Sequence, residues 1–106
     1  MTSQEYVENK LSEAVKLFPQ IHCRQEHDIH SEIHFIEVTP ASYFKKDISF
    51  KEWRKKTFFE FISLYPEGLC FFPKERRKHI IENCEFEIQG SLYKSRKKVT
   101  TQLANL

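Results

Sequence analysis

Histidine, cysteine and glutamate side chains, the groups that bind transition metals in proteins, gather in one short stretch of this sequence. The stretch holds His22, Cys23, His27, His30, Glu32 and His34. If residues 30–34 are extended, His30, Glu32 and His34 share one face of a strand, which suits a site of two histidines and one carboxylate. No CxxC or HExxH motif accompanies them. Metal binding at these three residues is therefore the third of three functional hypotheses, and solvated histidines along a hairpin are the alternative interpretation.

The sequence offers little for catalysis. Its three cysteines, Cys23, Cys70 and Cys84, lie in or beside apolar segments, which is typical of reduced thiols in a core. With only two glycines, the chain has neither a P-loop nor a dinucleotide-binding fingerprint, and the GxSxG motif is also absent. We therefore predict no catalytic residues and no cofactor, and a non-enzymatic protein is favoured.

Basic residues form four short clusters, and aromatic residues lie near them in the sequence. The clusters are Lys45-Lys46, Arg54-Lys55-Lys56, Arg76-Arg77-Lys78 and Arg96-Lys97-Lys98. Aromatic and arginine side chains are enriched at the centres of protein interfaces. The candidate partner-binding residues are Trp53, Arg54, Lys55, Lys56, Phe59, Arg76, Arg77 and Lys78. If the clusters converge on one face, they could instead follow a phosphate backbone, although the sequence pI of 8.4 is modest for a nucleic-acid-binding domain.

Charge is divided unevenly along the chain, which has a formal net charge of +2. Residues 1–40 contain three basic and seven acidic side chains, whereas residues 41–106 contain fourteen basic and eight acidic ones. Such an asymmetry suggests a surface for a partner. The first hypothesis is thus a small protein-interaction module: an adaptor, an accessory subunit, a toxin-neutralising partner or a homo-oligomer. An RNA- or DNA-binding module is the alternative.

The 106 residues are enough for one domain, which we place at residues 1–93, with a basic and polar, flexible segment at 94–106. No secretory signal or membrane-spanning run is visible, so a cytoplasmic protein without membrane contact is expected. The apolar pattern predicts an α+β fold, in which two main amphipathic helices pack on one face of an antiparallel or mixed sheet of about four strands. The expected helices and helical turns cover residues 3–18, 50–65 and 74–83, and the expected strands lie within residues 21–38, 69–72 and 84–88.

Capping signals mark the helix starts. Thr2 and Glu5 have the spacing of a capping box, as do Ser49 and Glu52, and Ile48 is placed to act as a hydrophobic staple. Thr39 is expected to cap a short helical turn that begins at Pro40. A polar turn is expected near residues 26–28, between the first two strands.

Overall fold

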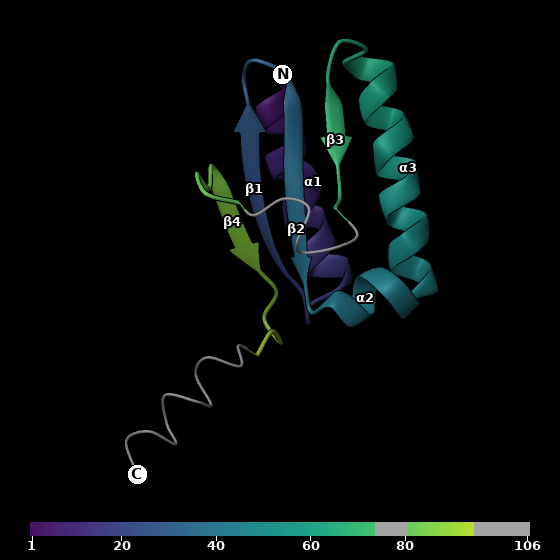
Figure 1. The fold of residues 1–106 in the computed structure, drawn as a ribbon. Helices are drawn as coiled ribbons and strands as arrows, with labels where there is room; N and C mark the ends of the chain where they lie inside the picture. The colour runs from purple at the N-terminus through teal and green to yellow at the C-terminus, as the bar shows by residue number, and fades with distance from the viewer. Residues whose placement is uncertain (74–80, 95–106) are drawn as a thin grey trace.

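The computed structural model describes residues 1–73 and 81–94, and its elements alternate irregularly between helix and strand (Figure 1). In chain order they are α1 (Ser3–Leu17), β1 (His22–Asp28), β2 (Ile33–Thr39), α2 (Ala41–Lys46), α3 (Ile48–Leu64), β3 (Leu69–Phe71) and β4 (Phe86–Gln89). The helical turn predicted at residues 74–83 falls mostly outside the described residues, and the C-terminal segment lies outside them from residue 95 onward.

The four described strands form one mixed sheet in the order β3-β2-β1-β4. β1 is antiparallel to both β2 and β4, whereas β3 runs parallel to β2. α1 lies behind the sheet in Figure 1, and α3 runs alongside β3. The predicted α+β fold with two main helices and a four-stranded sheet is confirmed, and the sheet is mixed.

One core cluster joins the helices to one face of the sheet. In β2, His34, Ile36 and Val38 are buried, while the residues between them are only half-buried. This alternation follows from the two-residue period of a strand. The apolar core members are Tyr6, Val7, Leu11, Ala14, Val15, Ile21, Cys23, Ile36, Val38, Phe50, Phe61, Cys70 and Phe72. No helix in the described part of the chain is long and apolar enough to cross a membrane.

Helix α1 begins as its sequence predicts. The Thr2 side chain accepts a hydrogen bond from the Glu5 amide, and the Glu5 carboxylate accepts one from the Thr2 amide. Val7, Leu11 and Ala14 recur at helical spacing and are buried. Local capping and helical periodicity are therefore sufficient to define this helix.

The predicted starts of α2 and α3 were wrong. Asp47 caps α3, because its carboxylate accepts a hydrogen bond from the Phe50 amide at 2.8 Å. Aspartate is as good a cap as serine and lies two residues before Ser49, so the helix begins earlier. Ile48 is then 72% exposed and does not act as a staple. At α2 the capping residue is Pro40 and not Thr39, and no side chain bonds to the helix end.

Two strand boundaries also differ from the prediction. β1 continues through residues 26–28 and pairs as far as Asp28 with Ile33, so the turn lies at residues 29–32. The polar residues of β1 continue the strand because Gln25 has partners in the core, and Arg24 and Glu26 have partners on the opposite face of the sheet, as described below. β4 begins only at Phe86, and Cys84 is exposed where a core position was expected.

Candidate functional site

A groove opens between helix α3 and strand β3, with a volume of about 360 Å³. We name this feature the α3–β3 groove; it is lined by Lys51, Arg54, Lys55, Phe58, Cys70, Phe71 and Phe72. Three of the seven lining residues are cationic and three are phenylalanines. The groove therefore combines apolar surface with positive charge.

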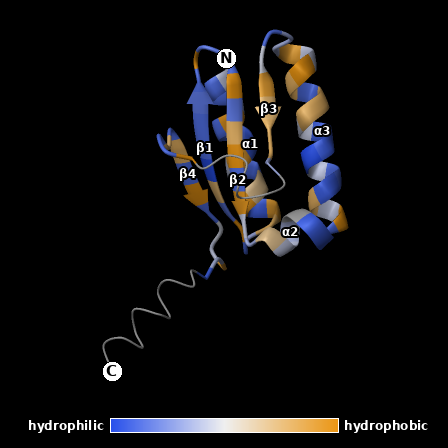
Figure 2. Ribbon diagram, in the orientation of Figure 1, coloured by the Kyte–Doolittle hydropathy of each residue, from blue (hydrophilic) through white to orange (hydrophobic). Residues whose placement is uncertain are grey.

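The lining residues come together for simple geometric reasons. On α3, residues 51, 54, 55 and 58 are spaced three or four apart, so they form one stripe along the helix. The chain turns after α3 and returns as β3, which places residues 70–72 beside that stripe. Figure 2 shows the hydrophilic part of α3 beginning beside the end of the apolar β3 and continuing toward α2. The mainly basic stripe of α3 thus lies beside an apolar strand.

Burial separates the floor of the groove from its rim. Cys70 and Phe72 are buried and form the floor, whereas Lys51 and Lys55 are exposed. Phe71 is 39% exposed, so part of the apolar surface is open to solvent. Arg54 is half-buried, and this burial lowers the pKa of its guanidinium.

The structure brings only two of the predicted partner-binding residues, Arg54 and Lys55, into the groove. The Trp53 ring stacks on Phe50 at 5.8 Å between centroids, and its indole N–H donates to Glu13 at 3.2 Å, so Trp53 is mainly a packing residue. Phe59 is 59% exposed and lies outside the groove lining, as does Lys56. The remaining three predicted residues, Arg76, Arg77 and Lys78, lie outside the described residues.

Sequence reasoning missed Lys51, Phe58 and the phenylalanines of β3 as groove residues. Their signal was present, because residues 51, 54, 55 and 58 follow helical spacing. This spacing did not reveal a groove, because the second wall of the groove comes from a strand more than ten residues away in the chain.

The second chemical cluster is a hydrogen-bonded network around the buried His34. Its Nε2 lies 3.0 Å from the Ser3 hydroxyl, and its Nδ1 lies 2.9 Å from the Gln25 amide nitrogen. The side-chain amides of Gln25 and Gln4 bond to each other twice, at 2.8 and 2.9 Å. Since the Gln25 nitrogen donates to Nδ1, the proton of His34 lies on Nε2 and is donated to Ser3. In this tautomer, His34 cannot act as a base toward the Ser3 hydroxyl.

The expected metal site does not form, because β2 begins at Ile33 and leaves His30 and Glu32 in the preceding turn. His34 instead enters the core, where both ring nitrogens have partners. Within residues 1–73 and 81–94, no group of three histidine, cysteine or acidic side chains could hold a metal ion. The prediction that these three residues share one strand face is therefore wrong.

Burial lowers the pKa of His34 to about 4, and the stacked His27 ring, 4.1 Å away between centroids, adds to this effect. Since the unfolded chain takes up the proton near pH 6.5, the free energy of unfolding should fall as the pH drops from 6.5 toward 4. We expect a loss of about 2 to 3 kcal/mol across this window. Urea unfolding at several pH values measures it. His34→Gln should lose most of the slope, and equal slopes for both proteins would contradict the assignment.

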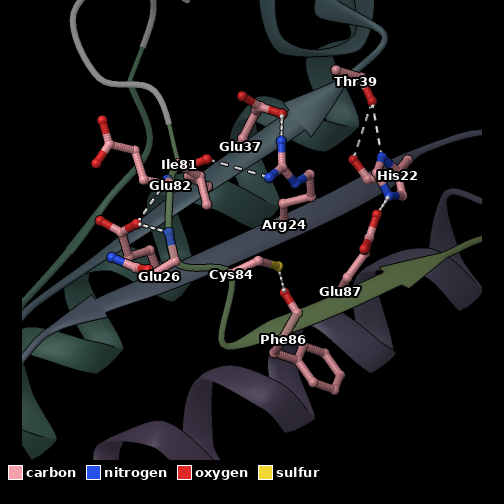
Figure 3. Close-up of polar contacts among 11 residues, drawn as sticks. His22, Arg24, Glu26, Glu37, Thr39, Ile81, Glu82, Cys84, Phe86 and Glu87 are labelled. Atoms are coloured by element: carbon pink, nitrogen blue, oxygen red, sulfur yellow. Dashed lines mark hydrogen bonds and ion pairs between the residues drawn. The ribbon is translucent and has the colours of Figure 1, made fainter.

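The sheet face opposite the core carries polar contacts that tie neighbouring segments together (Figure 3). Arg24 forms an ion pair with Glu37 at 3.6 Å and donates to the Ile81 carbonyl at 3.3 Å. The Glu26 carboxylate accepts from the amides of Glu82 and Asn83, at 2.9 and 2.7 Å. These contacts bind residues 81–83 to β1. They therefore explain the polar side chains of β1 as structural.

The buried thiols are also structural. Burial raises the pKa of Cys23 and of Cys70 to about 12, so both thiols are protonated near neutral pH. A protonated thiol is a poor nucleophile. Cys70 thus contributes apolar surface to the floor of the groove.

Comparisons of the chain with models of protein families, with curated proteins and with solved structures found no match. The structure shows a small α+β domain with a mixed sheet. An apolar groove lined in part by cations lies beside its edge strand β3.

Proposed function

We propose that this protein is a small protein-interaction module that binds an acidic segment of its partner in the α3–β3 groove. The observation that supports the proposal is the pairing of phenylalanine surface with Lys51, Arg54 and Lys55 in one groove. Apolar side chains anchor protein interfaces in desolvated pockets, and complementary charge around them steers the partner and fixes its register. The occupant should therefore carry an apolar anchor flanked by carboxylates.

The same groove is less suited to nucleic acid. A phosphate backbone requires cations spread along an extended track, whereas these three cations occupy two turns of one helix. The apolar floor is suited to an apolar side chain that a protein partner inserts.

A direct test uses a blocked synthetic peptide with one leucine between glutamates, titrated into the full chain. Trp53 is the single tryptophan, and its ring lies 6.3 Å from that of Phe72 in the groove, so its fluorescence should report binding. We expect saturable binding of this peptide and none of a peptide with lysines in place of the glutamates. Arg54→Glu combined with Lys55→Glu should weaken the binding at least about tenfold, a change of about 1.4 kcal/mol.

Lys56→Glu is the matched control for this double variant. It reverses a charge on the same helix but outside the groove lining, so it should bind the peptide as the original chain does. Oligouridylate is titrated in parallel. Steeply salt-dependent binding of the oligonucleotide, with no response to the acidic peptide, would replace the proposal by the nucleic-acid alternative.

A further inference from the structure

We infer that the occupant of the α3–β3 groove is a second copy of this chain, which inserts Ile29 from its turn between β1 and β2. This inference rests on the proposed function, because it names the partner of the same groove. The turn has the chemistry that the groove requires. Ile29 is 67% exposed, and Asp28 and Glu32 flank it.

The turn holds Ile29 in a defined position. The Asp28 carboxylate accepts a hydrogen bond from the His30 amide at 3.0 Å. At the other end, Glu32 has a φ of 58°, and its carbonyl accepts a hydrogen bond from the Leu69 amide at 3.0 Å. A turn that is ordered before binding loses less conformational entropy on binding. Ile29 is therefore a preformed anchor.

Charge around the turn complements the groove. Glu32 and Glu67 line a common cleft of about 390 Å³, so Glu67 adds a carboxylate beside Glu32. Residues 25–44 include no lysine or arginine. Hydrogen bonds from His30 and Ser31 lower the pKa of Asp28, which keeps this carboxylate ionised near neutral pH. Asp28, Glu32 and Glu67 thus make the turn and its surroundings acidic, which complements the three cations of the groove, and the Glu32 carboxylate also lies 3.4 Å from His27 Nε2.

Other exposed apolar side chains fit the groove less well. Ile48 lies between Lys46 and Lys51, Leu17 follows Lys16, and Phe59 lies one helical turn after Lys55. The cations of the groove would repel these surroundings. Leu64 lines the same cleft as Glu32 and Glu67, so it belongs to the surroundings of the turn. Leu17, which is 57% exposed at the end of α1 and follows Lys16, is therefore the matched control.

The turn and the groove are different surfaces of one molecule. The turn lies at the end of the β1–β2 hairpin, whereas the groove lies between α3 and β3 (Figure 1). Two copies can therefore exchange turns reciprocally in a closed dimer, or each copy can offer one free turn or one free groove in head-to-tail contacts. Such contacts extend association beyond the dimer unless a ring closes.

Sedimentation velocity over a concentration series of the full chain tests the inference. We expect the weight-average sedimentation coefficient to rise with concentration. Ile29→Ser should weaken association at least about tenfold, because the anchor is lost. Leu17→Ser should associate as the original chain does. Both residues are exposed, so both variants should keep the original urea midpoint, which shows that folding is intact.

Charge reversal gives a second, independent readout. The variant Arg54→Glu with Lys55→Glu reverses the groove, and the variant Glu32→Lys with Glu67→Lys reverses the surroundings of the turn. We expect each variant alone to be monomeric and their equimolar mixture to associate, because a reversed groove then meets a reversed turn. A mixture that stays monomeric would overturn the inference.

The two proposals can fail separately. If the chain is monomeric at every concentration but the acidic peptide still changes Trp53 fluorescence, the partner is another protein, and only the inference of self-association is wrong. If the chain is monomeric and the peptide does not bind, both proposals are wrong. Association that Ile29→Ser leaves unchanged would show that copies meet through another surface, which also overturns the inference.

Discussion

Replacing Phe61 by alanine should lower the free energy of unfolding by about 3 to 5 kcal/mol. The Phe61 side chain is completely buried, and its ring lies 5.9 Å from Tyr6, 5.6 Å from His34 and 5.2 Å from Tyr65 between centroids. These neighbours come from α1, β2 and the end of α3, so the cavity would open where the helices meet the sheet. A small domain has a total stability of about 5 to 15 kcal/mol. The loss should therefore be a large part of the total.

Urea unfolding followed by Trp53 fluorescence and by circular dichroism measures this loss. Phe59→Ala is the matched control, since it removes the same ring two residues earlier on α3, at an exposed position. Its effect should stay within about 0.5 kcal/mol. A loss below about 1 kcal/mol for Phe61→Ala would contradict the packing described for α3.

Replacing Gly90 by alanine should cost about 3 kcal/mol or more, because the added methyl group has no space. A Cβ atom at this position would lie 2.1 Å from the carbonyl oxygen of Pro19 and 2.5 Å from its Cα atom. Both are backbone atoms, so no side-chain rotation can relieve the overlap. The Gly90 amide also donates to the Ile21 carbonyl at 2.8 Å, which keeps the two segments together.

The expected result is a looser β4 edge as well as a lower stability. Hydrogen exchange at the amides of Gly90 or its replacement and of Leu92, which donates to the Pro19 carbonyl, should become faster in the variant. Gly68→Ala is the comparison, because its Cβ atom would approach one backbone oxygen at 2.9 Å and otherwise the Phe61 ring at 3.5 Å. It should destabilise less. Equal losses at both positions would contradict the difference in space.

Helix α3 shows how far its own sequence predicts the site. Its buried residues Phe50, Thr57 and Phe61 recur at helical spacing, which the sequence alone displays. The opposite, basic side of the helix was recognised as a candidate surface for a partner. Which of its cations line an apolar groove depended on β3, since only the parallel pairing of β3 with β2 places Phe71 and Phe72 beside Lys51 and Arg54.

The histidine-rich region shows the opposite outcome. Its residue types suggested a metal site, yet a shift of the turn to residues 29–32 separates His30 and Glu32 from the strand that carries His34. The side chain of Gln25 explains why β1 extends through this region. Its amide satisfies His34 and Gln4 inside the core, so β1 can continue as a strand despite its polar sequence.

The sequence by itself determined the class of fold and the elements that rest on local signals. Three such signals extend over only a few residues each: the capping box of Thr2 and Glu5, the apolar stripe of α1 and the β-branched residues of β2. Each can therefore be recognised in the sequence. The tertiary structure alone decided which faces meet: the parallel β3, the buried polar network of His34, and the groove beside α3. Periodicity shows that an element has an apolar or basic face, but the residues that cover that face come from distant parts of the chain.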